Sequence, residues 1–123
     1  MIVTWVAASG ATGYQILRAV GVTTPVLAGT VGVVLTFNDV EATPGILYNY
    51  SVKALSAAGP GLASTVNSGY RNLTAPSSVA ATDGTSTANV TVTWAASTGA
   101  TGYQVWRALG AGVAAQIATV GAG

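Results

Sequence analysis

The side chains that usually carry out protein chemistry are scarce in this sequence. It has no histidine and no cysteine, and its only acids are Asp39, Glu41 and Asp83. The chain therefore lacks Ser-His and Cys-His nucleophile pairs and the usual zinc ligands. Asp39 and Glu41, with Asn38, could form an acid–base pair or a calcium site, but such sites need several converging ligands. We expect these side chains to lie at a turn and face water, and the chain to be no enzyme and to need no cofactor or metal.

Charge is scarce as well, and this bounds the partners of the chain. Of 123 residues, 6% are charged and 50% are hydrophobic, and the net charge is +1. The apolar content is ample for a core, while the charge offers no attraction for nucleic acid or an anionic membrane. A charge-poor surface favours association. The most apolar stretch, residues 108–123, is too short and too rich in glycine for a membrane-spanning helix, so we expect strands there and no membrane span.

The elements that hold these residues are strands arranged in a repeat. The stretch from Thr4 to Ala19 returns 89 positions later, so that Trp94 takes the place of Trp5. A fixed period of this length indicates a duplicated unit of about the size of a small domain. Apolar and polar side chains alternate in both copies, which is typical of short antiparallel strands in a sandwich. Turn signals separate the strands, as at Ser9-Gly10, Pro44-Gly45, Asp83-Gly84 and Thr98-Gly99.

The order of these motifs resembles a bacterial-type fibronectin type III domain. The motifs that match, in the order of that domain, are Pro76–Thr82 for strand A, Val90-x-Val92-x-Trp94 for strand B, Gly102–Arg107 for strand C, Phe37-x-Asp39 for the end of strand E, and Tyr48-x-Tyr50-x-Val52 for strand F. The resemblance implies an all-β, immunoglobulin-like antiparallel sandwich. It also implies that Tyr48 is a corner tyrosine, whose hydroxyl bonds back to the preceding backbone.

By this resemblance the chain holds one nearly complete copy and the N-terminal half of a second. We expect a fibronectin type III-like repeat without its first strand over residues 1–74, and strands A to about C′ of the next repeat over residues 75–123. Half a sandwich cannot bury its inner face, and open strand edges invite pairing. Either the chain is a fragment of a longer polypeptide, or neighbouring copies complete one another by strand addition. We favour the fragment, because a second copy would bring strands B and C that are not needed.

One group of side chains is predicted to form an interaction surface. Most aromatic residues alternate into the core, but Trp106 alternates against its apolar neighbours in strand 102–107 and is expected to point outward. Leu17 has the same place in the first copy. An outward tryptophan could contact a sugar, a peptide or a sister subunit, or be covered by a neighbouring strand. Arg18 and Arg107 follow these positions and are expected to be solvated charges at strand edges. The predicted surface consists of Trp106, Leu17, Arg18 and Arg107.

The expected function is structural. Tandem sandwiches make a rod, so we expect a structural or adhesive repeat of an extracellular filament, sheath or adhesin stalk, outside the cell or at its surface. Self-association or neighbouring repeats are the expected partners, with a glycan or a cell-surface protein as alternatives. The chain would then be a spacer or glycan-binding accessory module of a secreted carbohydrate-active enzyme, or else a phage or virion surface decoration. Acceptor sequons for glycosylation stand at Asn49, Asn72 and Asn89.

Overall fold

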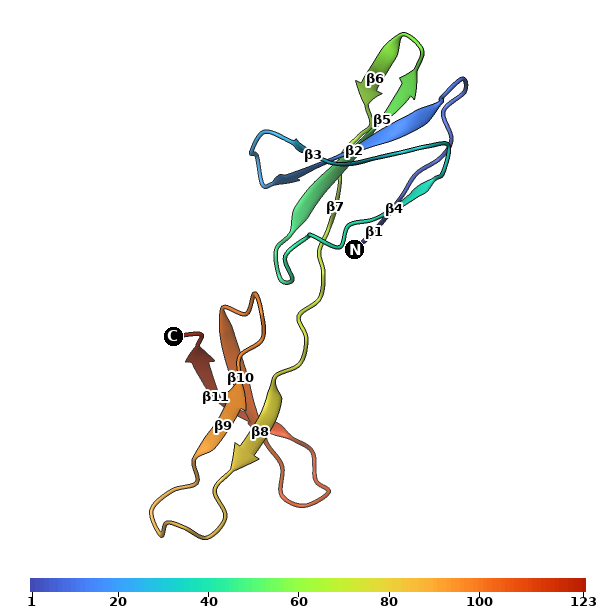
Figure 1. Cartoon of the computed structure of the whole chain (residues 1–123). Coiled ribbons are helices and arrows are strands. Elements are labelled where there is room, and N and C mark those ends of the chain that lie inside the picture. Colours follow the sequence, from blue (N-terminus) through green and yellow to red (C-terminus); the bar gives the residue numbers. More distant parts are fainter. The chain divides into compact units, whose positions relative to one another are not determined.

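The computed structural model describes residues 1–123, which form strands and no helix. They divide into two compact units, Met1–Asn72 and Leu73–Gly123 (Figure 1). Every strand pair is antiparallel, which confirms the prediction of an all-β fold built from antiparallel sheets. With strands as its only regular elements, the chain has no helix that could span a membrane.

The first unit contains two sheets. The larger sheet has the order β3-β2-β5-β6, with β7 also paired to β5, and the smaller sheet consists of β1 and β4. The strands are β1 (Ile2–Thr4), β2 (Gly13–Val20), β3 (Val26–Val31), β4 (Thr36–Asn38), β5 (Tyr48–Ser56), β6 (Gly59–Ala63) and β7 (Asn67–Gly69). Apolar and polar residues already alternate from Val33 to Phe37, but β4 begins only at Thr36, and Val33 is exposed.

The core of the first unit lies between the two sheets. Ile16 of β2 is its one large, completely buried side chain, and the rings of Tyr14 and Tyr50 are buried beside it. From the smaller sheet, the Phe37 ring covers the backbone of β3 so closely at Gly29 that a Cβ atom there would collide with it. This packing explains why a glycine lies in the interior of β3.

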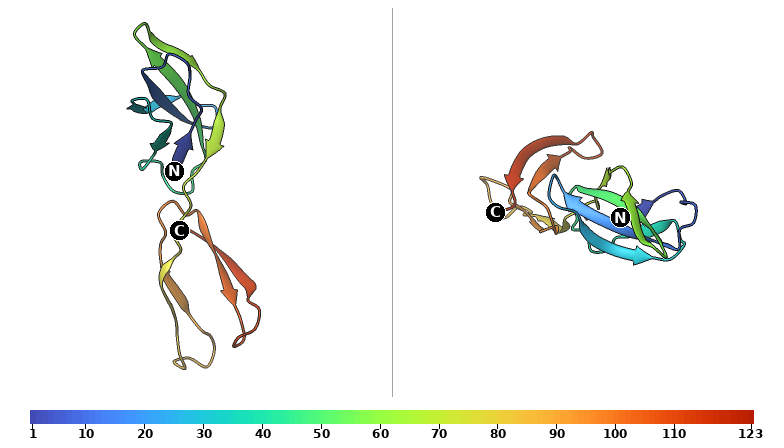
Figure 2. Two further views of the ribbon diagram at one scale, coloured as in Figure 1. Left: turned by 90° about the vertical axis from the view of Figure 1, so that its right-hand side faces the viewer. Right: turned by 90° about the horizontal axis from the view of Figure 1, so that it is seen from above.

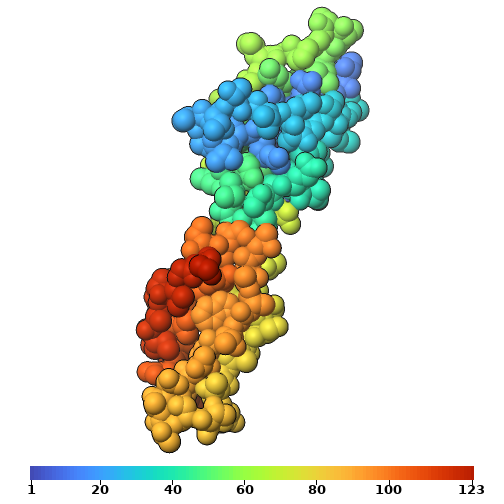
Figure 3. Space-filling model, turned by 60° about the vertical axis from the view of Figure 1, so that its left-hand side comes forward, coloured from blue at the N-terminus to red at the C-terminus, as the bar shows by residue number.

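The second unit contains two separate pairs of strands (Figure 2). One pair is β8 (Ser77–Ala81) with β9 (Val92–Ala95), and the other is β10 (Gly102–Arg107) with β11 (Ala115–Gly121). Every residue of β8 and β11 is exposed, and β11 runs over the surface of the unit in Figure 3. The apolar stretch 108–123 thus contains a strand, as predicted.

The two units share the same local construction around their repeated tryptophans. The rings of Trp5 and Tyr14 lie 5.3 Å apart with 58° between their planes, and those of Trp94 and Tyr103 lie 5.4 Å apart with 59°. Each tyrosine hydroxyl accepts a backbone N–H from the preceding turn, that of Ala8 at 3.0 Å and that of Ser97 at 2.9 Å. The predicted equivalence of the two tryptophans is confirmed.

The equivalence extends along the following hairpin. Tyr14 pairs with Val31 and Tyr103 with Val120, and both hairpins shift register at the same place, after Ile16 in one and after Val105 in the other. The turns before the hairpins also agree, because Gly10 and Gly99 have φ angles of 77° and 84°. Glycine adopts this left-handed conformation without steric cost, which explains its return in both copies.

Candidate functional site

A buried ion pair joins the two sheets of the first unit. Nη1 of Arg18, on β2, lies 2.6 Å from Oδ2 of Asp39, just after β4, and Asp39 is 2% exposed. Oδ2 also accepts the hydroxyl of Tyr50 at 2.9 Å, while Oδ1 accepts the backbone N–H groups of Glu41 and Ala42. The expectations that Asp39 faces water and that Arg18 is a solvated charge are therefore wrong, because each neutralises the other inside the unit.

The hydrogen bonds determine how these groups titrate. Burial alone would raise the pKa of Asp39, but hydrogen bonds from Arg18 and Tyr50 outweigh burial and lower it. The hydrogen bond to Asp39 raises the pKa of Arg18. Burial, together with the hydrogen bond to Asp39, raises the pKa of Tyr50. Asp39 is thus held as a carboxylate whose two oxygens already accept four hydrogen bonds. These four hydrogen bonds support a structural role for Asp39, which anchors the loop after β4.

The same loop is held from two further sides. The hydroxyl of Tyr48 accepts the backbone N–H of Thr43 at 3.3 Å, which confirms the bond to the preceding backbone that the resemblance implied. The guanidinium carbon of Arg18 lies 5.1 Å from the centre of the Tyr48 ring. Nη1 of Arg71 donates to the backbone carbonyls of Val40 and Ala42. The sequence analysis did not predict this role of Arg71. Arg71 lies outside every alternating stretch, so no local pattern indicates that its side chain contacts this loop.

The four predicted surface residues are divided between the two units and differ in their exposure. Arg18 takes part in the buried pair, and Leu17 is half-buried beside its cross-strand partner Ser51. In the second unit Trp106 is 55% exposed, and Arg107 is exposed as well. Trp106 borders a shallow depression of about 150 Å³ that is shared with Pro76, Val79, Val92, Trp94, Tyr103, Gln104 and Val105. Trp106 is thus exposed, while its predicted direction opposite to Tyr103 and Val105 stays a prediction, since all three residues border the same depression.

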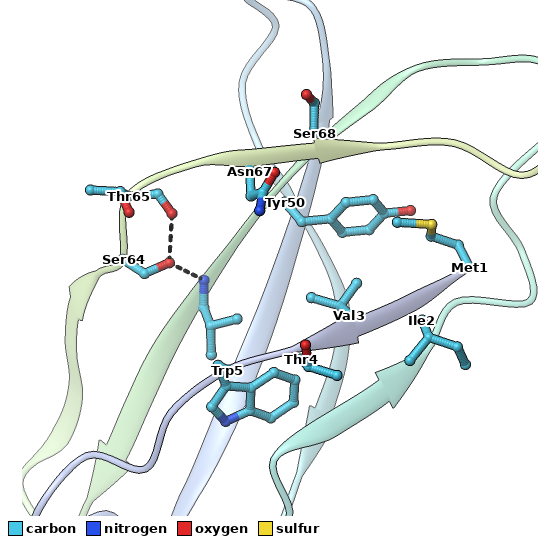
Figure 4. Close-up of a pocket in the computed structure, with 11 residues that line it drawn as sticks. Met1, Ile2, Val3, Thr4, Trp5, Tyr50, Ser64, Thr65, Asn67 and Ser68 are labelled. Carbon is cyan, nitrogen blue, oxygen red and sulfur yellow. Dashed lines mark hydrogen bonds between the residues drawn. The ribbon is translucent and has the colours of Figure 1, made fainter.

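A second candidate site is a groove beside β1 that sequence reasoning missed. It has a volume of about 330 Å³ and is lined by Met1, Ile2, Val3, Thr4, Trp5, Tyr50, Val52, Ser64, Thr65, Asn67 and Ser68. Figure 4 shows Val3 and the Tyr50 ring on the two sides of this space, with Met1 at the hydroxyl end of the ring. None of the lining side chains is charged. The groove can therefore hold an uncharged segment and offers no acid–base pair for chemistry.

Two buried polar atoms have no hydrogen-bond partner, Nε1 of Trp5 and Oγ of Ser97. The counterpart of Ser97 in the first unit is Ala8, so the hydroxyl adds nothing that the shared turn requires. A buried hydroxyl without a partner is destabilising. We expect Ser97→Ala to raise the free energy of unfolding of the second unit by about 1 kcal/mol.

Urea unfolding followed by tryptophan fluorescence measures this change. Thr98→Ala is the matched control, because Thr98 is the exposed neighbour in the same turn and should leave stability almost unchanged. A loss of stability in Ser97→Ala would show that the hydroxyl has a role that the structure does not explain.

Comparison with protein-family models and with curated proteins found no relative of this chain.

Proposed function

We propose that this chain is part of a tandem array of fibronectin type III-like sandwiches, with a structural or adhesive role in an extracellular filament, sheath or adhesin stalk. The observation that carries the proposal is the residue-by-residue agreement of the two units, from the tryptophan–tyrosine contact to the shifted hairpin register. A module that is repeated at this level of detail suits a building element. We propose no catalytic role. The chain has no histidine or cysteine, and Asp39 is bound to Arg18 and Tyr50 and holds the loop after β4.

The surface supports association. Only 6% of the residues are charged, and exposed apolar side chains are numerous in both units. Proteins with little net charge and apolar surface associate more readily than highly charged ones. The repeats of one array and those of neighbouring arrays are therefore the partners that we propose, at the cell surface or outside the cell.

Sedimentation velocity and negative-stain electron microscopy of the 123-residue chain test this proposal. We expect the average sedimentation coefficient to rise with protein concentration and the micrographs to show elongated particles. A chain that remains monomeric at every concentration, without particles in the micrographs, would contradict the proposal.

The exposed Trp106 favours a second candidate, a glycan-binding accessory module of a secreted carbohydrate-active enzyme. An exposed aromatic ring beside a shallow depression is the kind of surface on which a sugar ring stacks. Under the structural proposal, Trp106→Ala weakens association, and neither the wild type nor the variant is retained by insoluble polysaccharides.

Pull-down with cellulose and chitin, together with sedimentation, separates the two candidates. Arg107→Ala serves as the control, because Arg107 is exposed next to Trp106 and carries no aromatic ring. Retention of the wild type that is lost only in Trp106→Ala would favour the glycan-binding module. If Trp106→Ala changes neither association nor retention, the ring has no contact role.

A further inference from the structure

The chain leaves the first unit at Arg71, shortly after β7 and just before the boundary at Asn72. Arg71 is bound there to the loop between β4 and β5 by three hydrogen bonds. Its backbone carbonyl accepts the N–H of Gly45 at 2.9 Å, and its Nη1 donates to the carbonyls of Val40 at 2.7 Å and Ala42 at 3.0 Å. The place where the chain passes into the joint is therefore fixed to a loop of the first unit.

The loop between β4 and β5 is in turn fixed to the core. Oδ1 of Asp39, at the start of the loop, accepts two of its backbone N–H groups. Oδ2 of Asp39 binds Arg18 on β2 and Tyr50 on β5. These two strands are paired along the whole length of β2. A continuous series of polar contacts thus leads from the exit of the chain into the two central strands of the larger sheet.

The strand before the exit is held less firmly. β7 has three residues and pairs with β5 from Asn67 to Gly69. Tension from the joint would reach the Gly69 end of this strand first, so that its pairs with β5 would open one after another. The same tension reaches Arg71 before it reaches β7. The hydrogen bonds of Arg71 to the loop must therefore break before the first pair of β7 is pulled.

We propose that Arg71 is a mechanical clamp, which passes tension from the joint into the core of the first unit and keeps β7 from peeling away. This inference rests on the proposed function, because the repeats of a filament or stalk transmit tension through the joints that connect them. A guanidinium suits this role, since it keeps its charge at every physiological pH and its hydrogen bonds to carbonyl oxygens are charge-assisted.

Pulling on single molecules of the full chain along two directions tests the clamp. The chain has no cysteine, so pairs of introduced cysteines can carry the handles. Thr24→Cys with Thr74→Cys pulls between the tip of the β2–β3 hairpin and the joint, and this direction loads Arg71. Thr24→Cys with Ala58→Cys pulls β2 against β5 and leaves the joint without load. All three positions are exposed.

Arg71→Met removes the donors of the clamp and keeps the aliphatic part of the side chain. At constant force in the joint direction, we expect this variant to unfold at least about tenfold faster than the wild type, because a hydrogen bond from a charged group is worth at least that factor. In the other direction we expect an increase of less than about threefold, because the missing hydrogen bonds bear no tension there.

Ile16→Val is the matched control, because it removes a methyl group from the core and leaves the contacts of Arg71 in place. We expect it to speed unfolding by a similar factor in both directions. If tryptophan fluorescence shows that Arg71→Met does not fold, Arg71→Lys is pulled instead. Lysine keeps the charge without the planar fork, so its increase should be smaller and still confined to the joint direction.

The outcomes separate the clamp from the proposed function. If the substitution of Arg71 speeds unfolding equally in both directions, or in neither, the clamp is refuted while the proposed array stands. If the increase is confined to the joint direction, the clamp is confirmed. It remains confirmed even if sedimentation shows that the chain never associates, in which case the proposed assembly alone fails.

Discussion

Replacing Asp39 by alanine is expected to lower the free energy of unfolding of the first unit by about 3 kcal/mol. The substitution leaves the Arg18 guanidinium, the Tyr50 hydroxyl and two backbone N–H groups without their common acceptor. Removing one partner of a buried ion pair is costly because the remaining charge stays poorly solvated. Arg18 is 18% exposed and can reach some water, which places the loss at the lower end for such pairs. Urea unfolding followed by tryptophan fluorescence measures it.

The second copy supplies a matched control for this pair. Arg18 and Arg107 are equivalent in the repeat, but only Arg18 has a carboxylate partner, whereas Arg107 is exposed. We expect Arg18→Met to destabilise the first unit clearly and Arg107→Met to change stability by no more than about 0.5 kcal/mol. Equal effects of the two substitutions would show that the pair does not anchor the unit.

The Arg18–Asp39 pair also makes the free energy of unfolding of the first unit depend on pH. The pKa of Asp39 is lower in the folded chain than its ordinary value, so the folded state favours the carboxylate. Its contribution to stability is complete above the unfolded-state pKa of about 4 and is lost as the pH falls through the folded-state pKa. The wild type should therefore lose stability relative to Asp39→Ala as acid is added below about pH 4. A difference between the two proteins that stays constant down to pH 2 would contradict this account.

Ile16→Ala is the second substitution with a large expected effect. Ile16 is completely buried between the sheets of the first unit, and truncating such a side chain costs both its transfer free energy and a cavity. We expect the free energy of unfolding of the first unit to fall by about 3 kcal/mol. Equilibrium urea denaturation measures this, with the slope of the transition showing whether the unit still unfolds as one.

Val105→Ala is the control for Ile16→Ala, because Val105 has the equivalent place in the second unit. Its side chain is smaller and only half-buried, so the expected loss is about 1 kcal/mol. The difference between the two losses in free energy of unfolding measures how much more completely the core of the first unit is buried. A loss in Val105→Ala as large as that in Ile16→Ala would mean that the second unit is packed as tightly as the first.

The repeat and the strands can be predicted because their signals, alternation and turn residues, lie within short stretches of the sequence. Alternation places Tyr103 and Val105 on one face of their strand without knowledge of the rest of the chain, and Gly10 and Gly99 mark turns that need a left-handed residue. The all-β fold follows from these two signals. The start of β4 at Thr36 could not be predicted, because the alternation already begins at Val33 and nothing local indicates where pairing with β1 begins.

The ion pair shows where local reasoning fails. Arg18 shares its face of β2 with Tyr14 and Ile16, so the alternation itself placed it inward. The preference of charges for water predicts the opposite and is wrong here, because Asp39, 21 positions later in the chain, neutralises Arg18. Only the folded structure brings these two residues together.

The central claim is that the two units are successive copies of one β module, and a two-dimensional NOE spectrum of the full chain tests it most directly. The claim predicts ring-to-ring cross-peaks of similar strength between Trp5 and Tyr14 and between Trp94 and Tyr103, since both ring pairs have nearly the same separation and tilt. Cross-peaks for one ring pair, with none for the other, would contradict it.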